Sequence, residues 1–199
     1  MKKKSLVNEV SAVMGALMLL AFVVALGGCA HQGGNLSMKA PDEKSPQWVR
    51  AMACADPSHQ VLCGVGIAQG IDNLALAQDT ADARAESKLA EQFKVYVARL
   101  EKDYMENAGA GQGMDTRQDE QMVTDTMKSF VKETLPGATI VEHYRGTDGT
   151  LYAKCVLDMA VIKKTLSDSR AMSPEMKKAL QKDADKAFEE LNREESSHR

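Results

Sequence analysis

A stripe of apolar residues between positions 74 and 104 constrains the fold of this chain more than any other feature. Its members are three or four residues apart: Leu74, Ala77, Ala81, Ala85, Leu89, Phe93, Val97, Leu100 and Tyr104. This spacing puts them on one face of an α-helix, and most of the other positions carry polar side chains that suit solvent. We therefore predict a long helix that packs on its alanine face, with Asp72 as its N-cap.

The residues before this helix predict a strand over 61–68. Gly64 and Gly66 fall on one face of the strand, and a second apolar set falls on the other. Because glycine has no side chain, the alanine end of the helix can approach the strand closely at this point. The spacing Gly64-x-Gly66-x-x-x-Gly70 also imitates a dinucleotide-binding fingerprint, but that motif needs a βαβ unit with a short helix. Close helix–sheet packing is the interpretation that we favour.

A second helix and a hairpin follow. The helix is predicted over about 116–135, ended by Pro136-Gly137, with these residues inward: Met122, Val123, Thr126, Met127, Phe130 and Val131. Two alternating runs, about 139–145 and 150–158, then flank Asp148-Gly149, which suits a tight type I′ turn. If that turn has two residues, Ile140 and Tyr144 share the apolar face of the second strand, which includes Leu151, Ala153, Cys155, Leu157 and Met159.

These elements predict an α+β fold. A small antiparallel sheet, formed by the strand at about 61–68 and the hairpin at about 139–158, packs against a long alanine-rich helix and a second helix. A short helix over about 160–169 closes the domain. Ser173-Pro174 then suits the start of a charged C-terminal helix.

The seam of this C-terminal helix is narrow: Met176, Leu180, Ala184, Ala187 and Leu191. Two interpretations stay open. The helix is frayed and has no partner, or it docks on its own domain, on an envelope protein or on a second copy of the chain.

The N-terminus carries an export signal. Three lysines, an uncharged stretch over 10–28 and the tetrapeptide Leu26-Gly27-Gly28-Cys29 resemble a bacterial lipobox. That resemblance implies cleavage before Cys29 and attachment of fatty acids such as palmitate to it, so that Cys29 anchors the protein in a membrane. An uncleaved signal anchor is the alternative. Ala30 resembles the sorting pattern of the outer membrane, and we expect the domain to be periplasmic.

The expected organisation has four parts. They are a lipoprotein signal peptide at 1–28, the acylated cysteine and a flexible tether at 29–46, a folded domain at 47–169 and a charged helical tail at 170–199. Trp48, the only tryptophan, lies at the start of the domain. It is expected to be a core anchor rather than a ligand platform.

Several motifs in a fixed order resemble one family of bacterial lipoproteins. They are Pro46-x-Trp48, Gly64-Val65-Gly66, the alanine-spaced helix and the closing hairpin. The order resembles the LPP-twenty family, the twenty-kilodalton membrane-associated lipoproteins, over about 47–166. The insert before Gly64 and the tail after Ser169 depart from that pattern.

The resemblance to the LPP-twenty family implies an envelope protein without known catalytic residues. Related domains occur in flagellar outer-membrane lipoproteins. We therefore expect a non-catalytic structural or assembly module of the cell envelope, with a flagellar base as one setting. The alternative is a binding module that recognises peptidoglycan or a small envelope ligand in a groove beside Trp48.

Composition and motifs point away from catalysis and from nucleic acid. With a net charge of −3, the chain offers no electrostatic grip on phosphates. We expect no enzyme activity, no cofactor and no metal. The acidic residues Asp79, Asp82 and Glu86 fit a solvated helix face. His143 is expected at the surface, on the strand face turned away from the main apolar run.

The cysteines leave more than one pairing open. In an oxidising periplasm, a Cys54–Cys63 disulfide is the favoured interpretation, with Cys155 as the rival partner. Cys54, His59 and Cys63 also suggest part of a zinc site, but structural zinc needs a fourth ligand.

Overall fold

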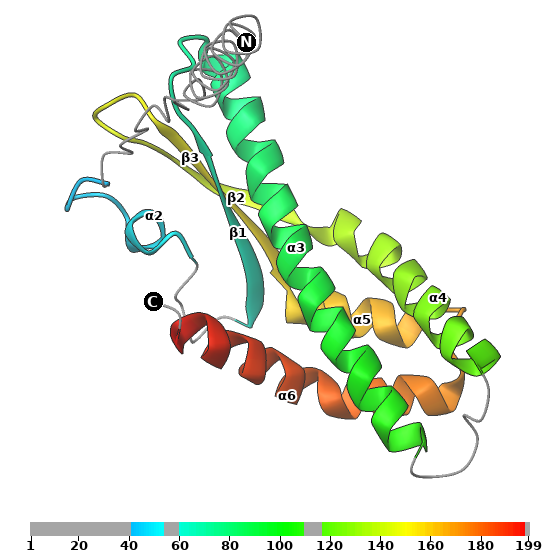
Figure 1. Ribbon diagram of the computed structural model, residues 1–199. Helices are drawn as coiled ribbons and strands as arrows, with labels where there is room; N and C mark the ends of the chain where they lie inside the picture. Colours follow the sequence, from blue (N-terminus) through cyan, green and yellow to red (C-terminus); the bar gives the residue numbers. More distant parts are fainter. Residues whose placement is uncertain (1–40, 54–59, 110–116, 198–199) are drawn as a thin grey trace, which may run out of the picture. The chain divides into compact units, whose positions relative to one another are not determined.

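The described part of the chain folds into a single α+β unit. The computed structural model describes residues 41–53, 60–109 and 117–197, all within the compact unit Ala40–Arg199. The elements follow in the order α2 (Gln47–Ala51), β1 (Val61–Ala68), α3 (Leu74–Gly109), α4 (Arg117–Thr134), the 3₁₀ turn η1 (Leu135–Gly137), β2 (Thr139–Arg145), β3 (Leu151–Asp158), α5 (Met159–Asp168) and α6 (Pro174–Ser197). The predicted α+β class is confirmed (Figure 1).

The sheet is small and entirely antiparallel. Its strand order is β1-β3-β2, so β3 is central and both other strands are edges. The long helix α3 crosses one face of the sheet, and its C-terminal half continues beyond the sheet to pack with α4 and α6 (Figure 1). The main core lies between this face of the sheet and the helices.

The alanine end of α3 and the glycines of β1 form the closest helix–sheet contact. A Cβ atom on Gly64 would lie 2.1 Å from the carbonyl oxygen of Ala85, and one on Gly66 would lie 1.9 Å from that of Ala81. Real Cβ atoms do not approach backbone atoms so closely, because the two atoms would overlap far inside their van der Waals radii. Ala81 and Ala85 are fully buried at this contact. The expected close approach is confirmed.

The start of α3 differs from the prediction in two ways. The N-cap is Asn73 rather than Asp72, because Asn73 Oδ1 accepts a hydrogen bond from the Leu76 N–H at 3.1 Å. Leu74, the first residue of the predicted stripe, is 53% exposed because this turn of α3 precedes the glycine contact with β1. Tyr96, which the stripe omits, is fully buried instead.

The hairpin loop is longer than a two-residue turn. The Gly149 N–H donates to the Gly146 carbonyl at 3.0 Å, and the Gly146 N–H donates to the Thr150 carbonyl at 2.8 Å. A type I′ turn needs a positive φ at both central residues, but in this loop only Gly149 has one, at 84°. The predicted type I′ turn at Asp148-Gly149 is therefore wrong.

A bulge in β2 changes which side chains share a face. The pairing register between β2 and β3 shifts between Ile140 and Glu142, so Ile140 lies opposite Cys155 but Tyr144 lies opposite Tyr152. An extra residue in one strand reverses the alternation of every side chain beyond it. Ile140 therefore packs on the main core as expected, whereas the prediction for Tyr144 is wrong.

The buried face of α4 is narrower than predicted. Its buried residues are Val123, Met127, Phe130 and Thr134. Met122 is 64% exposed, so its predicted inward position is wrong. The helix lies against α3 and α5 along one stripe, and Met122 falls outside it.

A second, smaller apolar cluster covers the opposite face of the sheet. Its buried residues are Trp48, Val49, Cys63, Val65 and Tyr152. Trp48 and Val49 come from the short helix α2, and the others come from β1 and β3. Trp48 is only 7% exposed, which confirms that it is a core residue.

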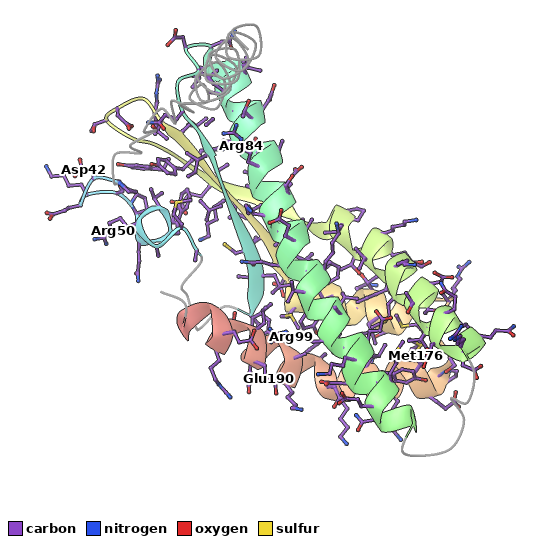
Figure 2. All side chains as sticks on the ribbon, viewed as in Figure 1. Asp42, Arg50, Arg84, Arg99, Met176 and Glu190 are labelled. Atoms are coloured by element: carbon purple, nitrogen blue, oxygen red, sulfur yellow. The ribbon has the colours of Figure 1, made fainter. Side chains whose placement is uncertain are left out.

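The C-terminal helix α6 belongs to the same packed unit. The Ser173 Oγ accepts a hydrogen bond from the Met176 N–H at 3.1 Å, as expected of an N-cap before Pro174. The predicted seam is buried against α3 and α5, and the Tyr96 hydroxyl donates to the Ala184 carbonyl at 3.1 Å. Figure 2 shows Arg99 and Glu190 where α3 and α6 run together. Of the interpretations left open, docking on its own domain is the one that the structure bears out.

The glycine contact predicts a large loss of stability from one added methyl group. Gly64→Ala places a Cβ against the backbone of α3, so we expect the free energy of unfolding to fall by about 3 kcal/mol or more. Gly146→Ala is the matched control, because its nearest obstacle is a side-chain atom, Asp148 Oδ1, rather than helix backbone, and it is expected to cost less than Gly64→Ala, about 1 kcal/mol. Urea denaturation followed by circular dichroism measures both; equal losses would contradict the packing.

The burial of α6 predicts that its seam contributes to the stability of the whole unit. Leu180 is 1% exposed, so we expect Leu180→Ala to cost about 3 kcal/mol. Leu76→Ala removes the same atoms at a position that is 56% exposed, and we expect a change within about 0.5 kcal/mol. The comparison uses the same urea titration. A Leu180→Ala protein as stable as the parent would mean that α6 is not packed in solution.

Candidate functional site

The cysteines that the sequence singles out fall into three environments. Cys29 and Cys54 lie outside the described residues. Cys63 is disulfide-bonded, whereas Cys155 is a buried free thiol. The alternative Cys63–Cys155 pairing is therefore wrong, and the Cys54–Cys63 pairing stays a prediction. Zinc binds thiolates, so the disulfide-bonded Cys63 is not available as a zinc ligand.

Two of the glycines that imitate a nucleotide-binding loop pack directly against α3. The space next to Gly64 and Gly66 is filled by the backbone of α3, where a phosphate would have to lie. Gly70 has a φ of 72°, which suits the turn that ends β1. These positions support the close-packing interpretation.

His143 and Asp82 form a contact that links β2 to α3. The His143 Nε2–H donates to Asp82 Oδ1 at 2.6 Å, and both side chains are partly buried, with exposed fractions of 32% and 26%. His143 lies opposite Ala153, on the face of the sheet that α3 covers. The prediction that His143 is turned away from the main apolar face is therefore wrong, and the bulge in β2 is the reason.

Asp79, Asp82 and Glu86 form an acidic flank along α3. Asp79 and Glu86 are exposed, as expected of a solvated helix face, but Asp82 is held by His143. The flank also acts on the interior of the protein. Burial, followed by the carboxylates of Glu86 and Asp82, raises the pKa of the Cys155 thiol to about 11. Sequence reasoning missed this grouping because Cys155 and His143 are far from α3 along the chain.

A surface hollow continues the acidic flank. It has a volume of about 560 Å³ and lies between α3 and η1. Its lining is Ala83, Glu86, Ser87, Ala90, Leu135, Pro136 and Ala138. Small and apolar residues therefore form most of the lining, and Glu86 contributes its only carboxylate.

Side chains of α3 form hydrogen bonds with the backbone of one edge strand of the sheet, β1. The backbone of β1 is bonded by helix side chains: the Cys63 N–H donates to Gln92 Oε1 at 3.4 Å, and Arg84 donates to the Ile67 carbonyl. Figure 2 labels Arg84 on α3, which packs along β1. On β2, most side chains are exposed, including Val141 at the bulge, with 53% of its surface accessible. Within the described residues, side chains of α3 thus bond to the outer backbone of β1, and no helix side chain bonds in this way to β2.

The described residues carry neither a metal-binding group nor a membrane-spanning helix. No three His, Cys, Asp or Glu side chains within them are grouped so that they could hold a metal ion. No helix within the same residues is long and apolar enough to cross a membrane.

Comparison with known proteins adds no relative. No protein-family model matches the chain, and no curated protein matches it. The resemblance to the LPP-twenty family therefore stays a prediction.

The environment of Cys155 predicts a thiol that resists alkylation. With a pKa of about 11, about 0.1% of the thiol is ionised at pH 8, against about a quarter in an unfolded chain with a pKa near 8.5. We expect iodoacetamide to modify Cys155 at least about 100-fold more slowly in the native protein than in urea. Peptide mass spectrometry follows this residue by itself. Similar rates in both states would contradict the burial of the thiol.

Proposed function

We propose that the chain is a lipid-anchored protein of the outer membrane of a Gram-negative cell, with its domain in the periplasm. The observation that carries the proposal is the tetrapeptide Leu26-Gly27-Gly28-Cys29 behind a basic and then apolar N-terminus. Two or three acyl chains on Cys29 are enough to hold a protein on a membrane without a spanning helix. Ala30, which resembles the sorting pattern of the outer membrane, supports a location in that membrane rather than in the inner one.

Within the envelope, the domain acts as a non-catalytic structural or assembly module. Its reactive side chains are engaged in structure: Cys63 in a disulfide, Cys155 in the core and His143 with Asp82. The outer edge of β2, to whose backbone no side chain of the described helices bonds, is the feature that suits assembly. The ordered motifs around Gly64 favour a relation to the LPP-twenty family, and a flagellar base is one setting for such a module.

The alternative is a module that binds peptidoglycan or a small envelope ligand beside Trp48. Aromatic rings bind ligands through an accessible face, but Trp48 is only 7% exposed and packs in the second cluster with residues of β1 and β3. Ligand binding there would require α2 to leave the sheet. The assembly role needs no such movement, so it has the stronger support.

Two substitutions test the anchor and its destination separately. Serine has no thiol for the lipid transferase, so Cys29→Ser should abolish incorporation of labelled palmitate and leave the uncleaved precursor. Ala30→Asp should keep the lipid but move the protein to the inner membrane. Membrane fractionation on a sucrose gradient measures the destination. Palmitate on the Cys29→Ser protein would overturn the proposal, and an unchanged location of Ala30→Asp would overturn its outer-membrane part.

The buried position of Trp48 predicts how the two roles can be told apart. Trp48→Ala should reduce stability by about 3 kcal/mol or more, as loss of a buried aromatic ring does. Trp48→Phe should retain most of the packing. We expect neither the parent nor Trp48→Phe to sediment with purified sacculi. Sedimentation of the parent that is lost in a stably folded Trp48→Phe protein would favour the binding module instead.

A further inference from the structure

One short segment, residues 41–53, packs on the second face of the sheet, and we call it the strap. It contains α2, and Figure 1 shows α2 by itself on the side of the sheet opposite α3. Of the strap residues, only Ser45, Trp48 and Val49 are buried. The two apolar side chains among them therefore supply most of the attachment of the strap to β1 and β3.

Few polar contacts hold the strap in place. Its backbone hydrogen bonds to described residues all stay within the strap, such as the bond from the Ala53 N–H to the Trp48 carbonyl at 3.2 Å. Within the described part of the chain, one side-chain hydrogen bond joins it to the sheet, from Ser45 Oγ to the Tyr144 hydroxyl at 3.3 Å. The other described helices pack far more extensively on the sheet or on one another. A segment with so few contacts is expected to open before the rest of a domain does.

Two features of the docked strap are unfavourable. The Trp48 indole N–H is buried and has no hydrogen-bond partner among the described residues, so docking takes it out of water without replacing that bond. Met52 ends α2 with a φ of 52°, a left-handed conformation that disfavours any residue with a side chain. Both costs disappear when the strap leaves the sheet, because water then reaches the indole nitrogen and Met52 is free to change its conformation.

The main core does not depend on the strap. Its buried residues come from the other face of the sheet and from the helices that pack there, whereas Trp48 and Val49 belong to the second cluster. Removal of the strap therefore leaves the contact of Gly64 with α3 and the burial of Leu180 in place. The sheet and its four longer helices retain the contacts that fold them.

We propose that the strap releases from the sheet as a unit while the rest of the domain stays folded. Release adds residues 41–53 to the chain that leads from Cys29, which corresponds to about 45 Å of extended backbone. The predicted Cys54–Cys63 disulfide marks where the released chain ends, since it ties position 54 to β1. This inference rests on the lipid anchor proposed above, because release then increases the distance from the membrane that the domain can reach.

Hydrogen exchange of the Trp48 indole measures release directly. Trp48 is the only tryptophan, so its indole N–H gives a single NMR signal, and without a hydrogen bond this proton is protected by burial alone. Leu89 is fully buried in α3, and its amide reports unfolding of the domain. The sample is the full chain in a neutral detergent, and each rate is divided by that of the same group in an unfolded chain. We expect the indole to exchange at least about 100-fold faster than the Leu89 amide, with little dependence on low concentrations of urea.

A core substitution separates release of the strap from unfolding of the domain. Leu180→Ala destabilises the domain equally with the strap docked or released. It should therefore accelerate exchange of the Leu89 amide at least about tenfold and leave indole exchange unchanged. If the strap left only on unfolding, Leu180→Ala would accelerate both.

A matched pair of variants locates the opening at the strap. Val49 is fully buried, and Val49→Ala weakens only the docked state, so it should accelerate indole exchange at least about fivefold. Val95→Ala removes the same atoms from α3 at a position that is 47% exposed, and it should leave indole exchange unchanged.

Three outcomes would overturn the proposal. The first is protection of the indole equal to or greater than that of the Leu89 amide, and the second is faster indole exchange in the Leu180→Ala protein. The third is indole exchange that Val49→Ala leaves unchanged, because water would then reach the ring without release of the strap. None of these measurements depends on acylation of Cys29. Failure of the strap would therefore leave the membrane anchor untouched, and failure of the anchor would leave the exchange result standing.

Discussion

The backbone contact between α3 and β1 is the constraint on which the rest of the structure depends. Gly64 and Gly66 let Ala81 and Ala85 lie directly on the strand, and this proximity brings Gln92 and Arg84 within reach of the outward backbone of β1. Because α3 lies over β1 and β3, it covers little of β2. One packing event thus covers a sheet face and brings helix side chains to the β1 edge, whereas among the residues that the structure describes no helix side chain bonds to the backbone of the β2 edge.

Much of the fold follows from local patterns. The spacing of apolar residues and the turn residues at the ends of helices and strands predict single elements well. The bounds of β1 and β2 agree with the sequence prediction, and so does the stripe of α3 from Ala77 to Leu100. The apolar seam of the C-terminal helix could also be predicted, but the surface on which it packs could not. An apolar stripe shows which face of a helix is buried and not what covers that face. The positions of Asn73 and Met122 show the same limit at the ends and borders of helices.

The candidate site was less predictable because it depends on one irregular residue. The bulge at Val141 reverses the faces of β2, and with them the position of His143, which meets Asp82 from 61 residues away. An alternating sequence cannot show where a bulge falls. The sequence could not exclude a disulfide between Cys63 and Cys155. The fold excludes it, because the two residues lie on opposite faces of the sheet.

Amide hydrogen exchange tests most directly the claim that side chains of α3 bond to the outer backbone of β1, whereas no described helix bonds in this way to β2. Hydrogen-bonded and free residues alternate along an antiparallel ladder, and the Gly146 N–H bonds to Thr150 on the β3 side. In the full chain, the amides of Tyr144 and Glu142, which face β3, and that of Cys63, which bonds to Gln92, should be protected. The outward amides of His143 and Arg145 should exchange at nearly the rate of an unstructured chain. Strong protection of His143 and Arg145 in the protein without a partner would contradict the account, because it would mean that the β2 edge is already covered.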